Sequence, residues 1–156
     1  MLRTRYERTA DVDLQNRIGA YLANKMMYKG MPSDQWDKYE RNSMYDIDYV
    51  MEPVAGKSQV LLEIKNRNPK FEGIFKKDGL ILSTIKYKNL QALSVATGSN
   101  VLLVAAFAPR LYIHMVGSHK DLPIHKNSGR TNQRRDKWDV EDCYKIPSNT
   151  FTVIDQ

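Results

Sequence analysis

The sequence has little cysteine and no long hydrophobic run, and both absences narrow the kinds of protein it can be. Cys143 is the only cysteine among the 156 residues, which excludes an internal disulfide framework and a zinc site built from cysteines. The longest apolar run, residues 101–108, is strand-sized and far short of the ~18 residues that a membrane helix needs. The first residues lack the apolar region of a secretory signal. We therefore expect a protein of the reducing cytoplasm with no membrane partner.

Histidine and glycine-rich motifs are equally scarce. The three histidines, His114, His119 and His125, lack the helical i, i+4 spacing of a zinc site, and surface or core roles are expected for them. No glycine-rich phosphate loop is present, which argues against nucleotide hydrolysis of the P-loop kind. Cys143 has no matching histidine or asparagine nearby that would make it a nucleophile.

What the chain does have is an ordinary folding composition and an excess of positive charge. Hydrophobic residues make up 42% and charged residues 27%, which favours one folded domain over residues 1–156 rather than disorder. Lysine and arginine outnumber aspartate and glutamate by 24 to 18, a net charge of +6. Such a surface favours polyanions such as nucleic acid. The basic residues gather over residues 65–88 and again in a basic C-terminal segment of about residues 118–156.

Hydrophobic periodicity predicts interleaved helices and strands, hence an α/β or α+β fold. Helices are expected over residues 13–27, stopped by Gly30 and Pro32, and over residues 84–97, between Ser83 as N-cap and Gly98. Strands are expected over residues 44–51, 59–66, 101–107, 111–116 and 151–154, the first two as an antiparallel hairpin. Residues 66–79 are expected to form a basic loop.

Charged side chains interrupt the two strands of the expected hairpin. Glu63 and Lys65 are two residues apart, so they share one face of their strand, about 6.6 Å apart along it, while Ile64 points into the core. Asp46 and Asp48 share one face of the preceding strand, and pairing would bring them to Glu63 and Lys65. Paired carboxylates beside a lysine suit hydrolysis assisted by Mg²⁺ or Mn²⁺, because hard oxygen ligands select these ions.

These residues resemble the PD-(D/E)XK nuclease superfamily, which has the restriction-endonuclease-like fold: a central mixed sheet flanked by helices. The resemblance covers roughly residues 11–116. It implies that Asp48 and Glu63 hold the metal, with the Ile64 carbonyl as a third ligand, and that Lys65 is the catalytic lysine. Asp46 is the rival for the role of Asp48, which is preferred because its strand continues apolar.

The resemblance also implies a substrate and a setting. Arg67 and Lys86, which lie near the motif in the superfamily plan, are expected to contact DNA. The arginines of the C-terminal segment are expected to contact it as well: Arg130, Arg134 and Arg135. That segment is similar to the ends of small phage-encoded members, which implies an endonuclease of phage DNA metabolism acting in the host cytoplasm. Cutting both strands would suit a homodimer, since one domain carries one active site.

Two departures from the superfamily pattern keep other interpretations open. No proline precedes either aspartate, and the first helix has Gln15 and Asn16 where many members have a glutamate; Glu7 and Glu40 do not sit at matching places. The alternative function is therefore a catalytically inactive nucleic-acid-binding protein on the same fold. A protein-interaction module with a basic tail is a third interpretation, and Glu-x-Lys alone can be an ordinary cross-strand ion pair.

Overall fold

The computed structural model describes residues 9–35, 47–53, 56, 58–118, 122–125 and 142–155. Its centre is a six-stranded sheet in the order β1-β2-β3-β5-β6-β9. Only the β3–β5 pair is parallel, and every other neighbouring pair is antiparallel. The mixed sheet flanked by helices that the sequence predicted is thus confirmed. The strands of this sheet are β1 (Tyr28–Pro32), β2 (Tyr49–Pro53), β3 (Val60–Asn66), β5 (Asn100–Phe107), β6 (Arg110–Met115) and β9 (Thr152–Asp155).

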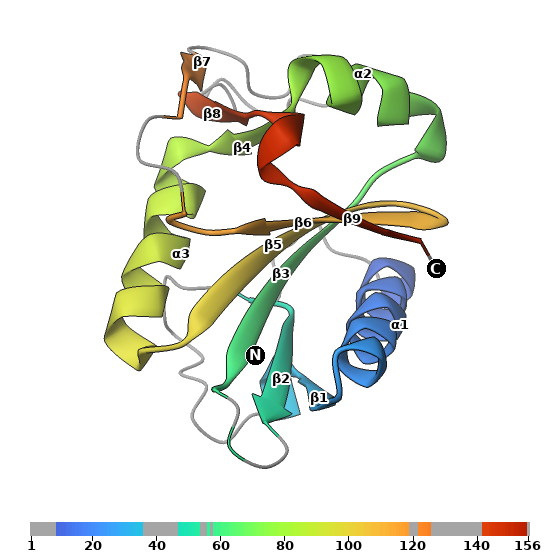
Figure 1. Cartoon of the computed structure of the whole chain (residues 1–156), viewed down its shortest axis with the longest axis vertical. Coiled ribbons are helices and arrows are strands. Elements are labelled where there is room, and N and C mark those ends of the chain that lie inside the picture. Colours follow the sequence, from blue (N-terminus) through green and yellow to red (C-terminus); the bar gives the residue numbers. More distant parts are fainter. Residues whose placement is uncertain are drawn as a thin grey trace.

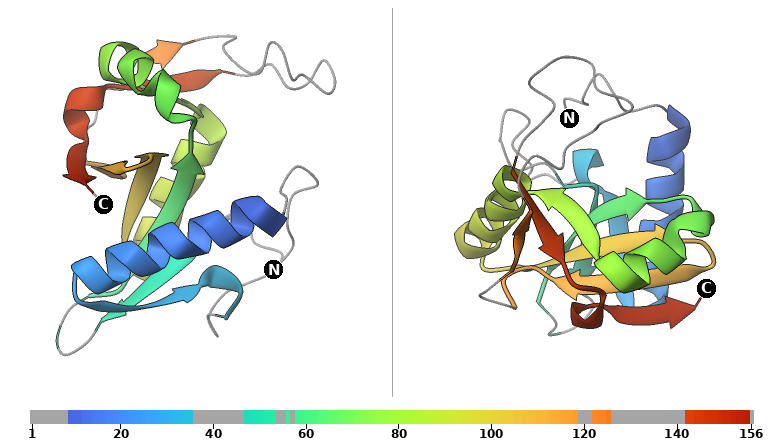
Figure 2. Two further views of the ribbon diagram at one scale, coloured as in Figure 1. Left: turned by 90° about the vertical axis from the view of Figure 1, so that its right-hand side faces the viewer. Right: turned by 90° about the horizontal axis from the view of Figure 1, so that it is seen from above.

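The first helix, α1 (Thr9–Lys25), covers one face of the sheet, as Figure 1 and the left view of Figure 2 show. Ile18 and Leu22 of α1 pack against alternate residues of the central strands, among them Leu62, Ile64 and Val104. The helix begins and ends earlier than predicted. Met27, with a φ of 62°, turns the chain directly into strand β1, because a left-handed residue cannot continue a helix. Gly30 and Pro32 therefore lie in a strand that pairs with β2, not in a helix stop.

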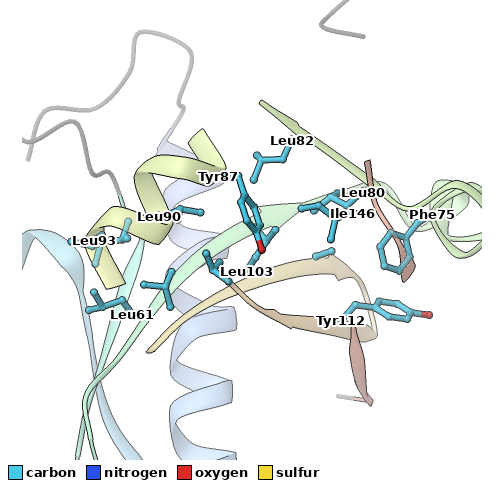
Figure 3. Packing of buried hydrophobic residues seen from close by; sticks show 14 of the residues in the cluster. Leu61, Phe75, Leu80, Leu82, Tyr87, Leu90, Leu93, Leu103, Tyr112 and Ile146 are labelled. Atoms are coloured by element: carbon cyan, nitrogen blue, oxygen red, sulfur yellow. The ribbon is translucent and has the colours of Figure 1, made fainter. Parts of the chain in front are cut away.

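The opposite face of the sheet is covered by α3 (Thr84–Thr97) and a second, three-stranded sheet. Ser83 caps α3 by accepting a hydrogen bond from the backbone N–H of Lys86, and Gly98 ends the helix with a φ of 67°, as predicted. Tyr87, Leu90 and Leu93 of α3 pack against Leu61 and Leu103 of the large sheet, and Figure 3 shows this layer. The core therefore has two layers, one on each face of the central strands.

Residues 66–79 are not the loop that the sequence predicted. They form a 3-10 turn, η2 (Pro69–Phe71), and a helix, α2 (Glu72–Asp78). Asn68 starts the turn by accepting a hydrogen bond from the Lys70 backbone N–H at 3.0 Å. Phe75 of α2 is buried against the aromatic rings of Phe107, Tyr112 and Phe151, so α2 caps one end of the core.

The second sheet was also not predicted, and it joins distant parts of the sequence. It has the order β4-β8-β7, formed by β4 (Leu80–Ser83), β8 (Cys143–Ile146) and β7 (Ile124–His125). Leu80 pairs with Ile146 across 66 positions of sequence, and Ile146 is fully buried. In Figure 1 this sheet and α2 lie at the end of the molecule opposite the β1–β2 hairpin. Its final turn, η4 (Ser148–Thr150), leads into β9.

Candidate active site

A bend directly before β2 brings Asp48 to the edge of β3. The backbone N–H of Asp48 donates to the Leu62 carbonyl at 2.9 Å, and its side-chain Oδ2 accepts from the Ile64 backbone N–H at 2.7 Å. Strand β3, which carries the motif, therefore holds Asp48 at two points: Leu62 through its backbone and Ile64 through its carboxyl. The bend also breaks the alternation expected for residues 44–51. Ile47 packs with Val50 on the α3 face, whereas an unbroken strand over residues 44–51 would place it with Tyr49 and Met51 on the α1 face.

Strand β3 separates its side chains as the period of two predicts. Ile64 is buried on the α1 face, and Leu61 is buried on the other. Glu63 and Lys65 share the face of Leu61 by alternation, and Lys65 Nζ lies 3.7 Å from Glu63 Oε2. The register of β2 on β3, Tyr49 opposite Leu62, places Asp48 next to Glu63. The structure thus brings together the three residues predicted to form the catalytic centre.

The two carboxyl groups share an environment in which a second negative charge is costly. Asp48 is 9% exposed and Glu63 is 8% exposed. Burial raises the pKa of Asp48 well above its usual value, and the adjacent Glu63 carboxyl raises it further, whereas the Ile64 N–H and the Lys65 ammonium lower it. A pair of buried, interacting carboxyls is a common arrangement in catalytic and metal-binding sites.

The donor set fits a hard divalent cation. Two carboxylates meet here, and Mg²⁺ usually uses one or two protein carboxylates and keeps several waters. The C=O of Ile64 points to the same side of β3 as its N–H, that is, toward Asp48. Among the described residues no group of three or more His, Cys, Asp or Glu side chains is close enough together to hold a metal. Any ion held here would therefore rely on the Asp48–Glu63 pair, carbonyl oxygen and water.

A small recess adjoins Asp48 on the side of α1. Its volume is about 10 Å³, roughly one water-sized sphere. Gln15 and Asn16 of α1 line it, as does Asp34 of the 3-10 turn η1 (Ser33–Gln35). These two amides lie in the helix where, according to the resemblance, many superfamily members have a glutamate. Asp34 was not singled out in the sequence, and its proximity follows from the turn after β1.

The remaining predicted site residues have varied positions. Arg67 is the first residue after β3 and is exposed. Lys86 is exposed on the first turn of α3, where its backbone N–H serves the Ser83 cap. Asp46, Arg130, Arg134 and Arg135 lie outside the described residues. Arg17 of α1, which no sequence motif singled out, lines the same pocket as Arg67. The only feature of the sequence that could have indicated Arg17 is its position next to the apolar residues of α1.

His114 has a structural role within the core. It is fully buried, and its Nε2 lies 2.8 Å from the Tyr87 hydroxyl while its Nδ1 lies 2.9 Å from Thr150 Oγ1. Thr150 Oγ1 donates to the Pro147 carbonyl at 2.7 Å, so it can accept a bond from Nδ1–H. His114 is therefore a hydrogen-bonded core histidine, and a core position is one of the two roles expected for the histidines.

No family model matches the sequence, and no curated protein matches it. Among solved structures, the chain is similar to Hjc, a Holliday junction resolvase from the archaeal hyperthermophile Archaeoglobus fulgidus. The TM-score is 0.51 at 15% sequence identity, and the match covers 86% of this chain and 88% of that chain. No helix among the described residues is both long and apolar enough to cross a membrane. The likeness, together with the mixed sheet and its flanking helices, shows that the chain has the restriction-endonuclease-like fold of the PD-(D/E)XK nucleases.

Proposed function

We propose that this protein is a metal-dependent nuclease that hydrolyses DNA phosphodiester bonds. The observation that carries the proposal is the pair of buried, contacting carboxyls of Asp48 and Glu63, with Lys65 3.7 Å from Glu63. Two adjacent buried carboxylates repel each other, and a divalent cation between them would offset that repulsion. The likeness of the fold to a Holliday junction resolvase supports DNA as the substrate class.

Each residue of the site has a distinct part in this proposal. Asp48 and Glu63 would hold Mg²⁺ or Mn²⁺, and the Ile64 carbonyl would add a third oxygen. The ion, when bound, supplies positive charge to the scissile phosphate and lowers the pKa of a nearby water. Lys65, on the same face as Glu63, orients the attacking water or stabilises the charge that develops on the phosphate. The Ile64 N–H fixes the Asp48 carboxyl in place.

The finer assignment is an endonuclease of phage DNA metabolism that acts in the host cytoplasm. The similarity of the C-terminal segment to small phage-encoded superfamily members supports it. Cutting both strands of a duplex with one site per chain calls for a homodimer, which sedimentation with and without DNA tests.

The test is cleavage of supercoiled plasmid, linear duplex and a four-way junction in Mg²⁺, Mn²⁺ or EDTA. We expect metal-dependent cutting that falls at least about 100-fold in Asp48→Asn, Glu63→Gln and Lys65→Met, since each removes a transition-state contact worth several kcal/mol. Glu52→Gln is the matched control, because Glu52 is a carboxylate on β2 that accepts a hydrogen bond from Gln59. Wild-type cleavage by any site variant would remove that residue from the mechanism.

A second candidate function is DNA binding without cleavage. The observation that favours it is the pair of amides, Gln15 and Asn16, beside Asp48 in place of a carboxylate. This alternative predicts DNA binding in EDTA and in Mg²⁺ but no cutting of any of the three substrates. It also predicts that Glu63→Gln leaves the affinity for DNA unchanged.

A further inference from the structure

A pocket of about 560 Å³ opens where β3 and β5 end, on the face of the sheet that α1 covers. Pockets of 300–1,000 Å³ are the usual size for small-molecule ligands. The carboxyl ends of parallel strands are also the common ligand-binding edge of a sheet, and β3 and β5 are the parallel pair of this sheet. The pocket begins one residue beyond Lys65 in the sequence, but it lies on the face opposite to the one that Glu63 and Lys65 share, so the end of β3 separates it from the proposed catalytic centre.

The walls of the pocket combine positive charge with apolar surface. Arg17 projects from α1 and Arg67 follows β3, and the carboxamides of Asn66 and Asn68 lie beside them. Apolar side chains also line the pocket, among them Leu14, Ile18, Ala106 and Ala108. No carboxylate from the described part of the chain lines the pocket. A ligand that matches this lining has an anionic group and a flat or apolar part.

Hydrogen bonds hold the part of the lining that follows β3. The Arg67 backbone N–H donates to the Ala106 carbonyl at 2.9 Å, which ties the end of β3 to β5. Arg67 Nη1 donates to the Asn66 carbonyl at 3.2 Å, and Asn68 accepts from the Lys70 backbone N–H at the start of the next turn. A segment fixed in this way loses little entropy when a ligand binds.

We propose that this pocket holds one unpaired nucleotide of the DNA strand, with its phosphate on Arg17 and Arg67 and its base against the apolar side chains of the lining. Arg67 is the first residue after β3 and lies two residues past Lys65, about 6.6 Å along a strand, so a DNA strand held at Glu63 on the other face reaches the pocket around the end of β3. A base stacked within a duplex has both faces covered and cannot enter. The pocket therefore selects substrates with unpaired nucleotides next to the cleavage point, such as overhangs and flaps. This inference rests on the proposed action on DNA.

The experiment measures binding in EDTA, where cleavage does not interfere, by fluorescence anisotropy of labelled DNA. The probes are a blunt duplex, the same duplex with a single-stranded overhang, and an overhang whose first nucleotide lacks its base. We expect wild type to bind the overhang about tenfold more tightly than the blunt duplex, which corresponds to about 1.4 kcal/mol gained by burying one base against aliphatic side chains. Removing the base should abolish most of that preference.

Two variants test the pocket directly, and a third is the control. Arg17→Gln removes the phosphate contact, and Ala108→Leu fills the pocket from an exposed position without changing charge. Both should lose the preference for the overhang. Lys25→Gln removes one charge from the exposed end of the same helix and should keep it. Circular dichroism checks that each variant is folded.

The outcomes separate this inference from the proposed nuclease function. A preference that survives both pocket variants, or that is equal with and without the base, would overturn the nucleotide pocket even if metal-dependent cleavage is present. A preference that both variants abolish would support the pocket even in a protein that cuts nothing.

Discussion

At the scale of single residues, the buried carboxyl of Asp48 serves the proposed activity at a cost in folding stability. Its carboxyl is buried beside Glu63, and both effects raise its pKa. A raised pKa in the folded state means that folding favours the protonated form. The stability that this proton contributes is fully present below the unfolded pKa of about 3.9. It is lost as the pH rises through the raised folded value.

We therefore predict that Asp48→Asn is more stable than wild type at pH 8 in EDTA. Asparagine keeps an oxygen for the Ile64 N–H and removes the repulsion with Glu63. The expected gain is a few degrees in Tm, since about 1 kcal/mol corresponds to roughly 2–4 °C for a chain of this size. The gain should shrink as the pH falls toward 4. Thermal unfolding from pH 4 to pH 9 measures it, and an asparagine variant that melts below wild type at pH 8 would contradict the electrostatic argument.

Mg²⁺ should reverse this ranking if the carboxylates hold an ion. A ligand that binds only the folded state raises Tm with its concentration. Wild type should gain stability in millimolar Mg²⁺, and Asp48→Asn should not. Equal shifts in both proteins would place the ion elsewhere.

The arrangement of Glu63, Ile64 and Lys65 on their strand was predictable because it depends only on local geometry. Alternation alone puts Glu63 and Lys65 on one face of β3 and Ile64 on the other, and the structure confirms this. The choice of Asp48 needed one long-range assumption, that β2 pairs with β3, and the observed register supports it. Arg17 and Asp34 could not be found in the same way, because only the packing of α1 and the turn after β1 bring them to the strand ends.

At the scale of elements, the position of Asp48 depends on how its neighbour Tyr49 is held. The Tyr49 ring lies between Gly19 of α1 and Gly30 of β1. A Cβ added at Gly30 would lie 2.5 Å from ring atoms of Tyr49, and one added at Gly19 would also overlap the ring. The two glycines thus form a slot that joins α1, β1 and β2 around the residue next to Asp48.

We predict that Gly19→Ala destabilises the protein and slows cleavage, because Tyr49 has to shift. Overpacking a core typically costs about 1–3 kcal/mol, against which alanine gains about 1 kcal/mol in helix propensity. Gly73→Ala in α2 is the matched control, since a Cβ there meets nothing within 4 Å and should stabilise the helix. The readouts are urea unfolding and the cleavage rate. If the two alanine variants are equally stable, the slot does not constrain Tyr49.

The elements that the sequence did not reveal share a physical cause. Strands β1, β4 and β8 have four or five residues. That is too few for an alternation of apolar and polar residues to stand out from the neighbouring sequence. They are stabilised by distant partners, as Leu80 is by Ile146. Helix α2 is short and contains Gly73, and only Phe75 among its residues is buried. By contrast, α3 was predictable because its Ser83 cap, its buried face and Gly98 are all local signals.

At the scale of the whole molecule, the net charge of +6 favours DNA before any specific contact forms. Each phosphate that a cation neutralises releases counterions, so affinity falls with salt at a slope set by the number of neutralised phosphates. The slope therefore reports direct pairing with phosphates, whereas net charge alone changes the long-range attraction.

The last prediction uses this difference to test the arginines of the C-terminal segment, Arg130, Arg134 and Arg135. Replacing all three with glutamine should reduce the slope of log K against log salt by up to about 2.7, or about 0.9 for each phosphate that is no longer neutralised. The control replaces Lys25, Lys29 and Lys88, which are exposed on other elements, and removes the same three charges. Binding of duplex DNA between 50 and 300 mM salt measures both slopes in EDTA. If both triple variants bind more weakly but keep the wild-type slope, the arginines act only through the long-range attraction of the net charge. If only the arginine variant has a shallower slope, the C-terminal segment lies against the DNA backbone.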